Sequence, residues 1–241
     1  MPIKLALSFK AEANLEVSND LMHAFVFSLF PQEVAEKVHK REEKPFSLRG
    51  WNFTEKGLLL RISLLEDQLF PALVSHFYLS KKGFRLKDVE LQPVVPSGLR
   101  EEESISYQEL LELEAYEHYS VDFIKPTTFR RGRWDYPLPD PPALFRSLYR
   151  KWKSHHPFPL EEDKLLHQVY SKVYILAHKI RVETVELSFG KLRGFVGNVV
   201  FGINDKELSR LVHALLKFGE FSGVGRKSAM GMGVILLRKE T

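Results

Sequence analysis

The stretch that decides the fold is KLRGFVGNVVFGINDKELSRLVHALLKFGEFSGVGRKSAMGMGVILL, residues 191–237. It begins with an apolar run, residues 191–203, whose composition is typical of a β-strand. Asn204 and Glu207 then have the spacing of a capping box, which predicts that a helix begins here. That helix has one apolar stripe, formed by Leu208, Leu211, Val212, Leu215 and Leu216. A glycine-rich segment and a last strand, residues 234–237, complete the stretch, which therefore predicts a strand, a helix and a strand in succession.

The residues before this stretch supply the other half of the same unit. Residues 119–125 and 173–189 have the pattern of strands. Between them, Asp140 precedes Pro141 and Pro142, which predicts a helix start, because aspartate caps a first turn and proline is tolerated there. The predicted order is β-α-β-β-α-β.

The N-terminal part of the chain has the same order. Alternating apolar residues predict strands at 4–10, 46–53, 58–64 and 84–95, and helical spacing predicts helices at 19–30, 31–39 and 69–77. Prolines and a glycine at residues 93–98 then interrupt the pattern. We therefore predict an α+β protein with tandem ferredoxin-like (RRM-like) βαββαβ domains, residues 1–98 and 99–241.

Composition limits the classes of function. The chain has 241 residues, of which 44% are hydrophobic, enough for two cores, and a net charge of +4 that allows a nucleic-acid partner. It has no cysteine, which excludes disulfides, thiolate nucleophiles and cysteine-ligated metals. The most apolar helical stretch, residues 21–30, is too short to span a bilayer, and no export signal is visible. We expect a cytoplasmic protein with no membrane partner.

Basic and glycine residues form the predicted RNA-binding surface. Three arginines lie beside Trp134 and Tyr136, which combines charge for phosphates with aromatic faces for bases. The candidate RNA-binding residues are Arg130, Arg131, Arg133, Arg150, Lys151, Gly223, Gly225, Arg226, Lys227 and Ser228. The alternatives to RNA binding are a purely structural turn at the glycines and an ordinary solvated charged face at the cations. We expect Phe195 and Phe201 in the core, because the RNA-recognition signature around them is incomplete.

Four segments together resemble the CRISPR-associated repeat-RNA endoribonucleases of the RAMP superfamily. They are residues 38–50 (VHKREEKPFSLRG), 123–152, 191–203 and the glycine-rich segment FSGVGRKSAMGMG at 221–233. The resemblance covers most of the chain. It implies paired ferredoxin-like domains and a metal-independent endoribonuclease that cuts precursor crRNA within or beside each repeat.

The resemblance also implies the catalytic residues. RNA is cleaved without a metal when its own 2′-hydroxyl attacks the adjacent phosphorus, which needs proton transfer and charge stabilisation. Carried over from the family, His39 is the general acid or base and Lys44 a charge stabiliser, and the products are a 2′,3′-cyclic phosphate and a 5′-hydroxyl. Without the resemblance, His39 is an ordinary surface histidine. His23, which the sequence places among core residues, is a reserve candidate, and Ser47 is a weak substitute for the tyrosine that some family members use.

Several alternatives stay open. His155 and His156 have no acidic partners at ligand-like spacing, and we predict no metal and no cofactor. The main alternative function is a non-catalytic RNA-binding subunit of a CRISPR effector complex, and a cellular RNA-binding protein unrelated to CRISPR is a third. A homodimer is also possible.

Overall fold

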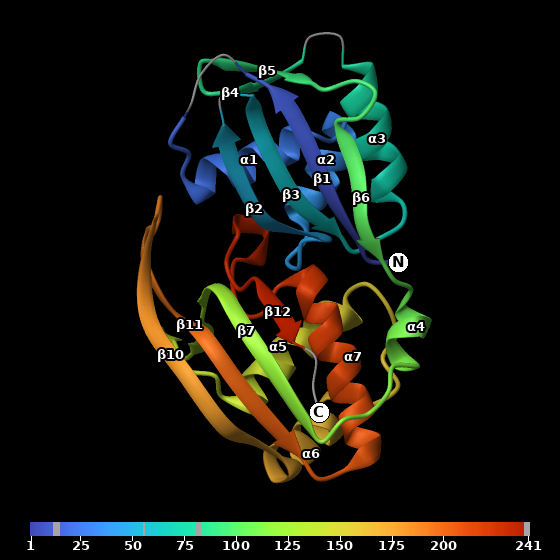
Figure 1. Ribbon diagram of the computed structural model, residues 1–241, viewed down its shortest axis with the longest axis vertical. Helices are drawn as coiled ribbons and strands as arrows, with labels where there is room; N and C mark the ends of the chain where they lie inside the picture. Colours follow the sequence, from blue (N-terminus) through green and yellow to red (C-terminus); the bar gives the residue numbers. More distant parts are fainter. Residues whose placement is uncertain (12–14, 55, 81–82, 239–241) are drawn as a thin grey trace. The chain divides into compact units, whose positions relative to one another are not determined.

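The computed structural model describes residues 1–11, 15–54, 56–80 and 83–238 and divides the chain into two units (Figure 1). Unit 1 consists of Met1–Ser104 together with the short segment Ala229–Gly231. Unit 2 consists of Ile105–Ser228 and Met232–Thr241. Residues 229–231 of the glycine-rich segment are therefore assigned by their contacts to unit 1, although they lie more than 120 residues after Ser104 in the sequence.

Unit 1 is an antiparallel sheet with helices packed on its apolar face. Its elements are β1 Ile3–Lys10, α1 Asn19–Ser28, α2 Gln32–Lys40, β2 Phe46–Thr54, β3 Gly57–Leu64, α3 Leu69–Leu79, β4 Phe84–Leu86, β5 Val89–Pro93 and β6 Leu99–Ser104. The strand order is β2-β3-β1, with β6 antiparallel to β1 on its other side, and β5 and β4 continue from the end of β1. Alternate residues of β1, Leu5, Leu7 and Phe9, are buried in the core that α1 and α3 cover.

The domain boundary lies later than predicted. Residues 99–104 form β6, in which Leu99 pairs with Leu7 and Ser104 with Ile3 of β1. The first unit therefore ends at Ser104 rather than at residue 98, because its sheet needs this last strand to complete the β-α-β-β-α-β order.

Unit 2 repeats the order with two additional helices and a small hairpin. Its elements are α4 Tyr107–Leu111, β7 His118–Thr127, β8 Phe129–Arg131, β9 Trp134–Tyr136, α5 Pro141–Lys153, α6 Glu162–Lys172, β10 Val173–Leu187, β11 Gly190–Ile203, α7 Lys206–Ser222 and β12 Ile235–Arg238. The sheet order is β10-β11-β7-β12, with antiparallel neighbours, and β10 and β11 form a long hairpin (Figure 1). Phe195 and Phe201 are fully buried, which confirms that they are core residues.

The helix starts of unit 2 test the predicted caps. Asp140 caps α5 as predicted, and its carboxylate accepts the N–H of Ala143 at 3.0 Å. The prediction for α7 was wrong by one residue: the cap is Asp205, not Asn204, and its carboxylate accepts the N–H of Leu208 at 2.9 Å. This hydrogen bond and the nearby Lys172 lower the pKa of Asp205.

The apolar stripe of α7 is confirmed, since Leu208, Val212, Leu215 and Leu216 are buried.

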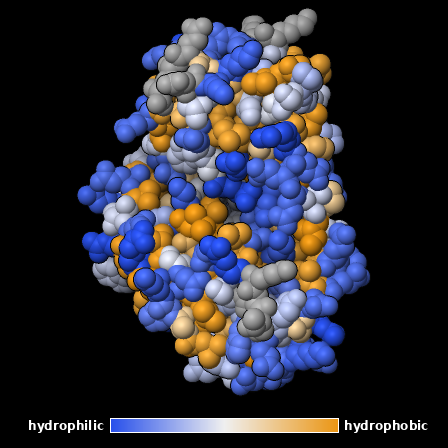
Figure 2. Space-filling view, viewed as in Figure 1, coloured by the Kyte–Doolittle hydropathy of each residue, from blue (hydrophilic) through white to orange (hydrophobic). Residues whose placement is uncertain are grey.

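On the face shown in Figure 2, hydrophilic side chains separate the hydrophobic ones. Among the described residues, no helix is both long enough and apolar enough to cross a membrane.

Candidate functional site

His39 lies in the last turn of α2 in unit 1. The imidazole is exposed on one side, and on the other it packs against Phe27 of α1, with ring centroids 5.4 Å apart. A histidine that contacts one aromatic ring edge-to-face and is otherwise exposed is restricted in orientation yet accessible to a substrate. This arrangement suits proton transfer.

Lys44 lies in the loop after α2, next to His39. Its ammonium donates to the backbone carbonyl of His39 at 3.1 Å and to that of Arg41. A cation at a helix C-terminus satisfies carbonyls that have no partner within the helix and interacts favourably with the helix dipole. The structure thus brings the two predicted catalytic residues together, and it also shows a structural task for Lys44 at the end of α2.

The same loop is anchored by an ion pair. The guanidinium of Arg41 donates to both carboxylate oxygens of Glu66, at 2.6 and 2.8 Å. This two-point contact raises the pKa of Arg41. Glu66 therefore holds the first residue of the loop, and Lys44, later in the loop, is bonded to the C-terminal end of α2.

His23 contacts the glycine-rich segment rather than lying deep in the core. Its Nδ1 is 2.9 Å from the carbonyl oxygen of Ala229, so Nδ1 carries the hydrogen that this oxygen accepts. Its ring also meets the edge of Phe27, with centroids 5.0 Å apart, so that Phe27 lies between His23 and His39. Asn19 adds a second bond, from Nδ2 to the carbonyl of Met230 at 2.6 Å. Sequence reasoning missed this association, because nothing in the local pattern relates α1 to residues 229–231.

The reserve residue Ser47 is buried in β2, directly opposite Ser63 of β3.

The glycines of the glycine-rich segment permit close backbone approach. Gly225 has φ +75, and a Cβ there would lie 2.4 Å from the carbonyl oxygen of Thr128. Gly233 has φ +65, and its Cβ would lie 1.8 Å from the carbonyl oxygen of Val224. A side chain would therefore both strain the backbone and clash with it. Packing within unit 2 accounts for these glycines without any ligand.

The backbone amides of this segment are already bonded within unit 2. The N–H of Gly225 donates to Ser147 Oγ at 2.9 Å, and the N–H of Gly223 donates to the carbonyl of Gly219 at 2.9 Å. Gly223 and Gly225 are buried and shape the loop, and their amide N–H groups are occupied within the protein rather than open to phosphates.

Lys151 of α5 is buried and forms hydrogen bonds to the glycine-rich segment. It is 4% exposed, and its ammonium donates to the carbonyls of Ser222 and Gly223 at 3.3 and 2.9 Å and to Ser228 Oγ at 2.9 Å. A buried, hydrogen-bonded ammonium cannot reach a phosphate in solvent. Burial gives Lys151 a supporting role in place of the predicted RNA contact, whereas an RNA contact by the half-buried Ser228 stays a prediction.

Three exposed arginines of unit 2 lie on the β8–β9 hairpin. Arg130, Arg131 and Arg133 are exposed there, and Trp134 is 79% exposed. The guanidinium of Arg131 lies over the ring of Tyr136, 4.5 Å from its centroid. Charge and aromatic surface thus occur together, as predicted from the sequence.

The remaining predicted cations have different surroundings. Arg226 forms an ion pair with Asp135 of β9, whereas the neighbouring Lys227 is exposed. Arg150 is exposed and pairs with Glu162 of α6 at 3.0 Å. Of these three, Lys227 presents its charge most openly.

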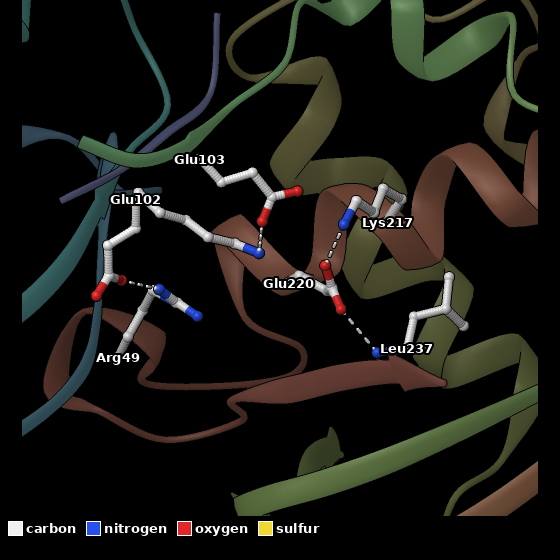
Figure 3. A network of polar contacts seen from close by, with 7 residues as sticks. Arg49, Glu102, Glu103, Lys217, Glu220 and Leu237 are labelled. Carbon is white, nitrogen blue, oxygen red and sulfur yellow. Dashed lines mark hydrogen bonds and ion pairs between the residues drawn. The ribbon is translucent and has the colours of Figure 1, made fainter. Parts of the chain in front are cut away.

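A buried carboxylate fixes the strand that follows the glycine-rich segment. Glu220 of α7 pairs with Lys217 at 2.6 Å and accepts the N–H of Leu237 in β12 at 2.8 Å (Figure 3). In unit 1, Figure 3 also shows Arg49 bound to Glu102 at 3.1 Å. Among the described residues, no group of three or more histidine, aspartate or glutamate side chains could hold a metal ion.

Comparisons with known proteins find proteins of similar sequence and fold. The family model for CRISPR-associated endoribonuclease Cas6 matches residues 121–235. The Cas6 endoribonuclease of Mycobacterium tuberculosis is 24% identical over 241 residues, covering 96% of this chain and 77% of the relative. That of Streptococcus thermophilus is 23% identical over 228 residues and covers 90% of each chain.

Solved structures extend the likeness to the whole chain. A Cas6 product complex superposes with a TM-score of 0.85 at 27% identity, covering 99% of this chain and 100% of the other. Thermus thermophilus Cas6 superposes with a TM-score of 0.74 at 27% identity, covering 99% and 98%. A RAMP protein described as binding different RNA substrates shares the fold at 11% identity and a TM-score of 0.59. In sequence, fold and domain repeat, the chain is similar to the CRISPR-associated Cas6 endoribonucleases.

Proposed function

We propose that this protein binds CRISPR repeat RNA and cuts precursor crRNA into units, without a metal ion. Similarity to the Cas6 family supports the endoribonuclease activity, and the exposed arginines of the β8–β9 hairpin support RNA binding. The observation that carries the catalytic part is the exposed His39 side chain at the end of α2, where the ammonium of Lys44 donates to the backbone carbonyl of His39 at 3.1 Å.

The proposed reaction uses the RNA's own nucleophile. The 2′-hydroxyl oxygen attacks the adjacent phosphorus, the bond from phosphorus to the 5′ oxygen breaks, and the products carry a 2′,3′-cyclic phosphate and a 5′-hydroxyl. His39 either accepts the 2′-hydroxyl proton or donates a proton to the leaving 5′ oxygen. The positive charge of Lys44 stabilises the charge that develops on the phosphate. His39 thus makes one of the two proton transfers, and a solvent water molecule makes the other.

Cleavage in excess EDTA tests the proposal. Purified protein should cut repeat RNA under these conditions and leave the two end groups named above. His39→Ala should bind the RNA with unchanged affinity and cut it about 10²- to 10⁴-fold more slowly. His178→Ala, at an exposed histidine of β10, is the matched control and should cut normally. Normal cleavage by His39→Ala would remove the catalytic assignment, and RNA left intact by the wild-type protein would count against an endoribonuclease.

A charge-reversal experiment tests the RNA surface. Changing Arg130, Arg131 and Arg133 to glutamate should weaken binding and reduce the slope of log affinity against log salt by about 0.7 per lost single-strand phosphate contact. The control reverses three exposed cations elsewhere in unit 2, Lys153, Lys164 and Arg210. Equal affinity and equal slope for wild type and the hairpin variant would mean that RNA binds elsewhere.

The non-catalytic subunit of an effector complex remains the alternative function. RNA that is bound tightly but never cut, with or without divalent ions, would favour it. The homodimer and assembly into an effector complex stay predictions.

A further inference from the structure

The turn of the β10–β11 hairpin presents an aromatic ring to solvent. Phe189 lies between Leu187 of β10 and Gly190 of β11 and is 56% exposed. The ammonium of Lys227 lies 4.6 Å from the centre of its ring. A cation over an aromatic face is a favourable electrostatic contact, which orders both side chains at this position.

We propose that Phe189 and Lys227 form a stacking site for an unpaired base of the bound RNA, an inference that rests on the proposed function. The base stacks on the ring of Phe189, and the ammonium of Lys227 contacts the phosphate of the same or the next nucleotide. Such sites combine an aromatic platform with a positive charge that follows the RNA backbone.

The backbone at Lys227 is the second observation. Its φ is +64, in the left-handed region that favours glycine, although the segment has glycines at other left-handed positions. The carbonyl of Lys227 accepts the N–H of Met232 at 3.2 Å, which holds this conformation. A long basic side chain in a strained position is expected where the side chain itself has a function.

The residue before it ties the site to the β8–β9 hairpin. Arg226 pairs with Asp135 of β9, and its N–H donates to the carbonyl of Thr128 at 3.1 Å. Adjacent residues of the segment therefore contact β9 on one side and the turn at Phe189 on the other. Trp134, in β9 beside Asp135, is a second exposed aromatic residue in the same unit.

The surrounding charge identifies the occupant as nucleic acid. Exposed Arg131 and Arg133 lie on the β8–β9 hairpin, and exposed Lys191, which pairs with Glu186 at 3.1 Å, lies two residues after Phe189 in β11. A hydrophobic partner surface gains nothing from this density of cations, whereas an RNA strand presents both bases and phosphates.

Affinity measurements at several salt concentrations test the site. Phe189→Ala should bind repeat RNA roughly 5- to 150-fold more weakly, the fold-change that corresponds to one lost base stack. The salt slope should be unchanged, because no phosphate contact is lost, whereas Lys227→Ala should reduce the slope by about 0.7. Phe189→Tyr should retain wild-type affinity, because it keeps the aromatic face.

Two controls separate stacking from other causes. Phe189→Leu keeps an apolar side chain without an aromatic face and should bind as weakly as Phe189→Ala. Tyr170→Ala removes another aromatic residue, 82% exposed on α6, and should bind like wild type. In RNA that carries 2-aminopurine at single positions, wild type should quench the fluorescence at one position, and Phe189→Ala should not.

The outcomes distinguish this inference from the proposed function. Wild-type affinity and quenching in Phe189→Ala, or wild-type affinity in Phe189→Leu, would overturn the stacking site while repeat-RNA binding stands. Failure of the wild-type protein to bind repeat RNA would overturn both.

Discussion

Replacing Lys151 by methionine removes a buried ammonium and keeps most of the apolar stem. The ammonium donates to the carbonyls of Ser222 and Gly223 and to the hydroxyl of Ser228, which join α5 to the glycine-rich segment. In Lys151→Met these acceptors lose their donor in a place where water does not replace it. The change is therefore expected to act on stability.

The magnitude follows from two opposing contributions. A hydrogen bond that involves a charged group contributes about 1.5–3 kcal/mol. Burying the ammonium itself costs several kcal/mol, and methionine avoids that cost. We expect Lys151→Met to lower the free energy of unfolding of unit 2 by about 2–4 kcal/mol.

Urea unfolding followed by tryptophan fluorescence measures the effect, because Trp152, the next residue of α5, is fully buried in unit 2. The midpoint should fall by about 1–2 M. Lys153→Met makes the same chemical change at an exposed position of α5 and should leave the midpoint in place. An unchanged midpoint in Lys151→Met, together with a reduced salt slope for RNA binding, would refute the supporting role and restore a direct RNA contact.

Further changes test the glycines, a helix cap and a histidine. Gly233→Ala places a Cβ 1.8 Å from a backbone carbonyl oxygen, so the free energy of unfolding should fall by more than the ~1–2 kcal/mol of left-handed strain. In Gly132→Ala the Cβ meets nothing within 4 Å, and only the strain should be lost. Equal unfolding midpoints for the two variants would contradict this. Asp140→Ala removes the acceptor of a first-turn N–H and should lower the free energy of unfolding, measured with urea, by about 0.5–2 kcal/mol. Asp140→Asn keeps an acceptor and should lose little of this stability. Burial lowers the pKa of His213 below its ordinary 6.5, so the unfolded chain takes up a proton first as the pH falls. The free energy of unfolding should therefore decrease below about pH 6.5, more steeply in wild type than in His213→Gln; identical pH profiles from pH 5 to 8 would contradict this.

Local patterns predicted the elements of the fold well where one physical signal dominated. The apolar residues of α7 repeat every three to four residues, and such a stripe is buried whichever element packs against it. The start of α5 was equally clear, because Asp140 and two prolines allow few other conformations. At α7, two adjacent residues can both cap a helix, and the backbone angles that select Asp205 over Asn204 depend on the preceding strand.

The candidate site was predicted in its residue types and less well in its roles. Arg130, Arg131 and Arg133 are exposed as their sequence indicates, since a short hairpin has no interior in which to bury them. Lys151 has the same residue type and a different environment, because the amphipathic pattern of α5 does not reveal which packed neighbour offers carbonyl groups. Phe189 was not singled out, because an exposed aromatic residue cannot be distinguished from a core one by sequence alone.

The glycine-rich segment shows the division between what sequence and tertiary structure determine. The sequence by itself determined the double β-α-β-β-α-β order, the absence of cysteine chemistry and the family resemblance, because each depends on residue types and local spacing. Only the tertiary structure decided that Ala229–Gly231 contact α1, that Lys151 supports the loop and that Lys227 meets Phe189. These contacts join residues far apart in the chain, and which of them form depends on the packing of whole elements rather than on any local preference.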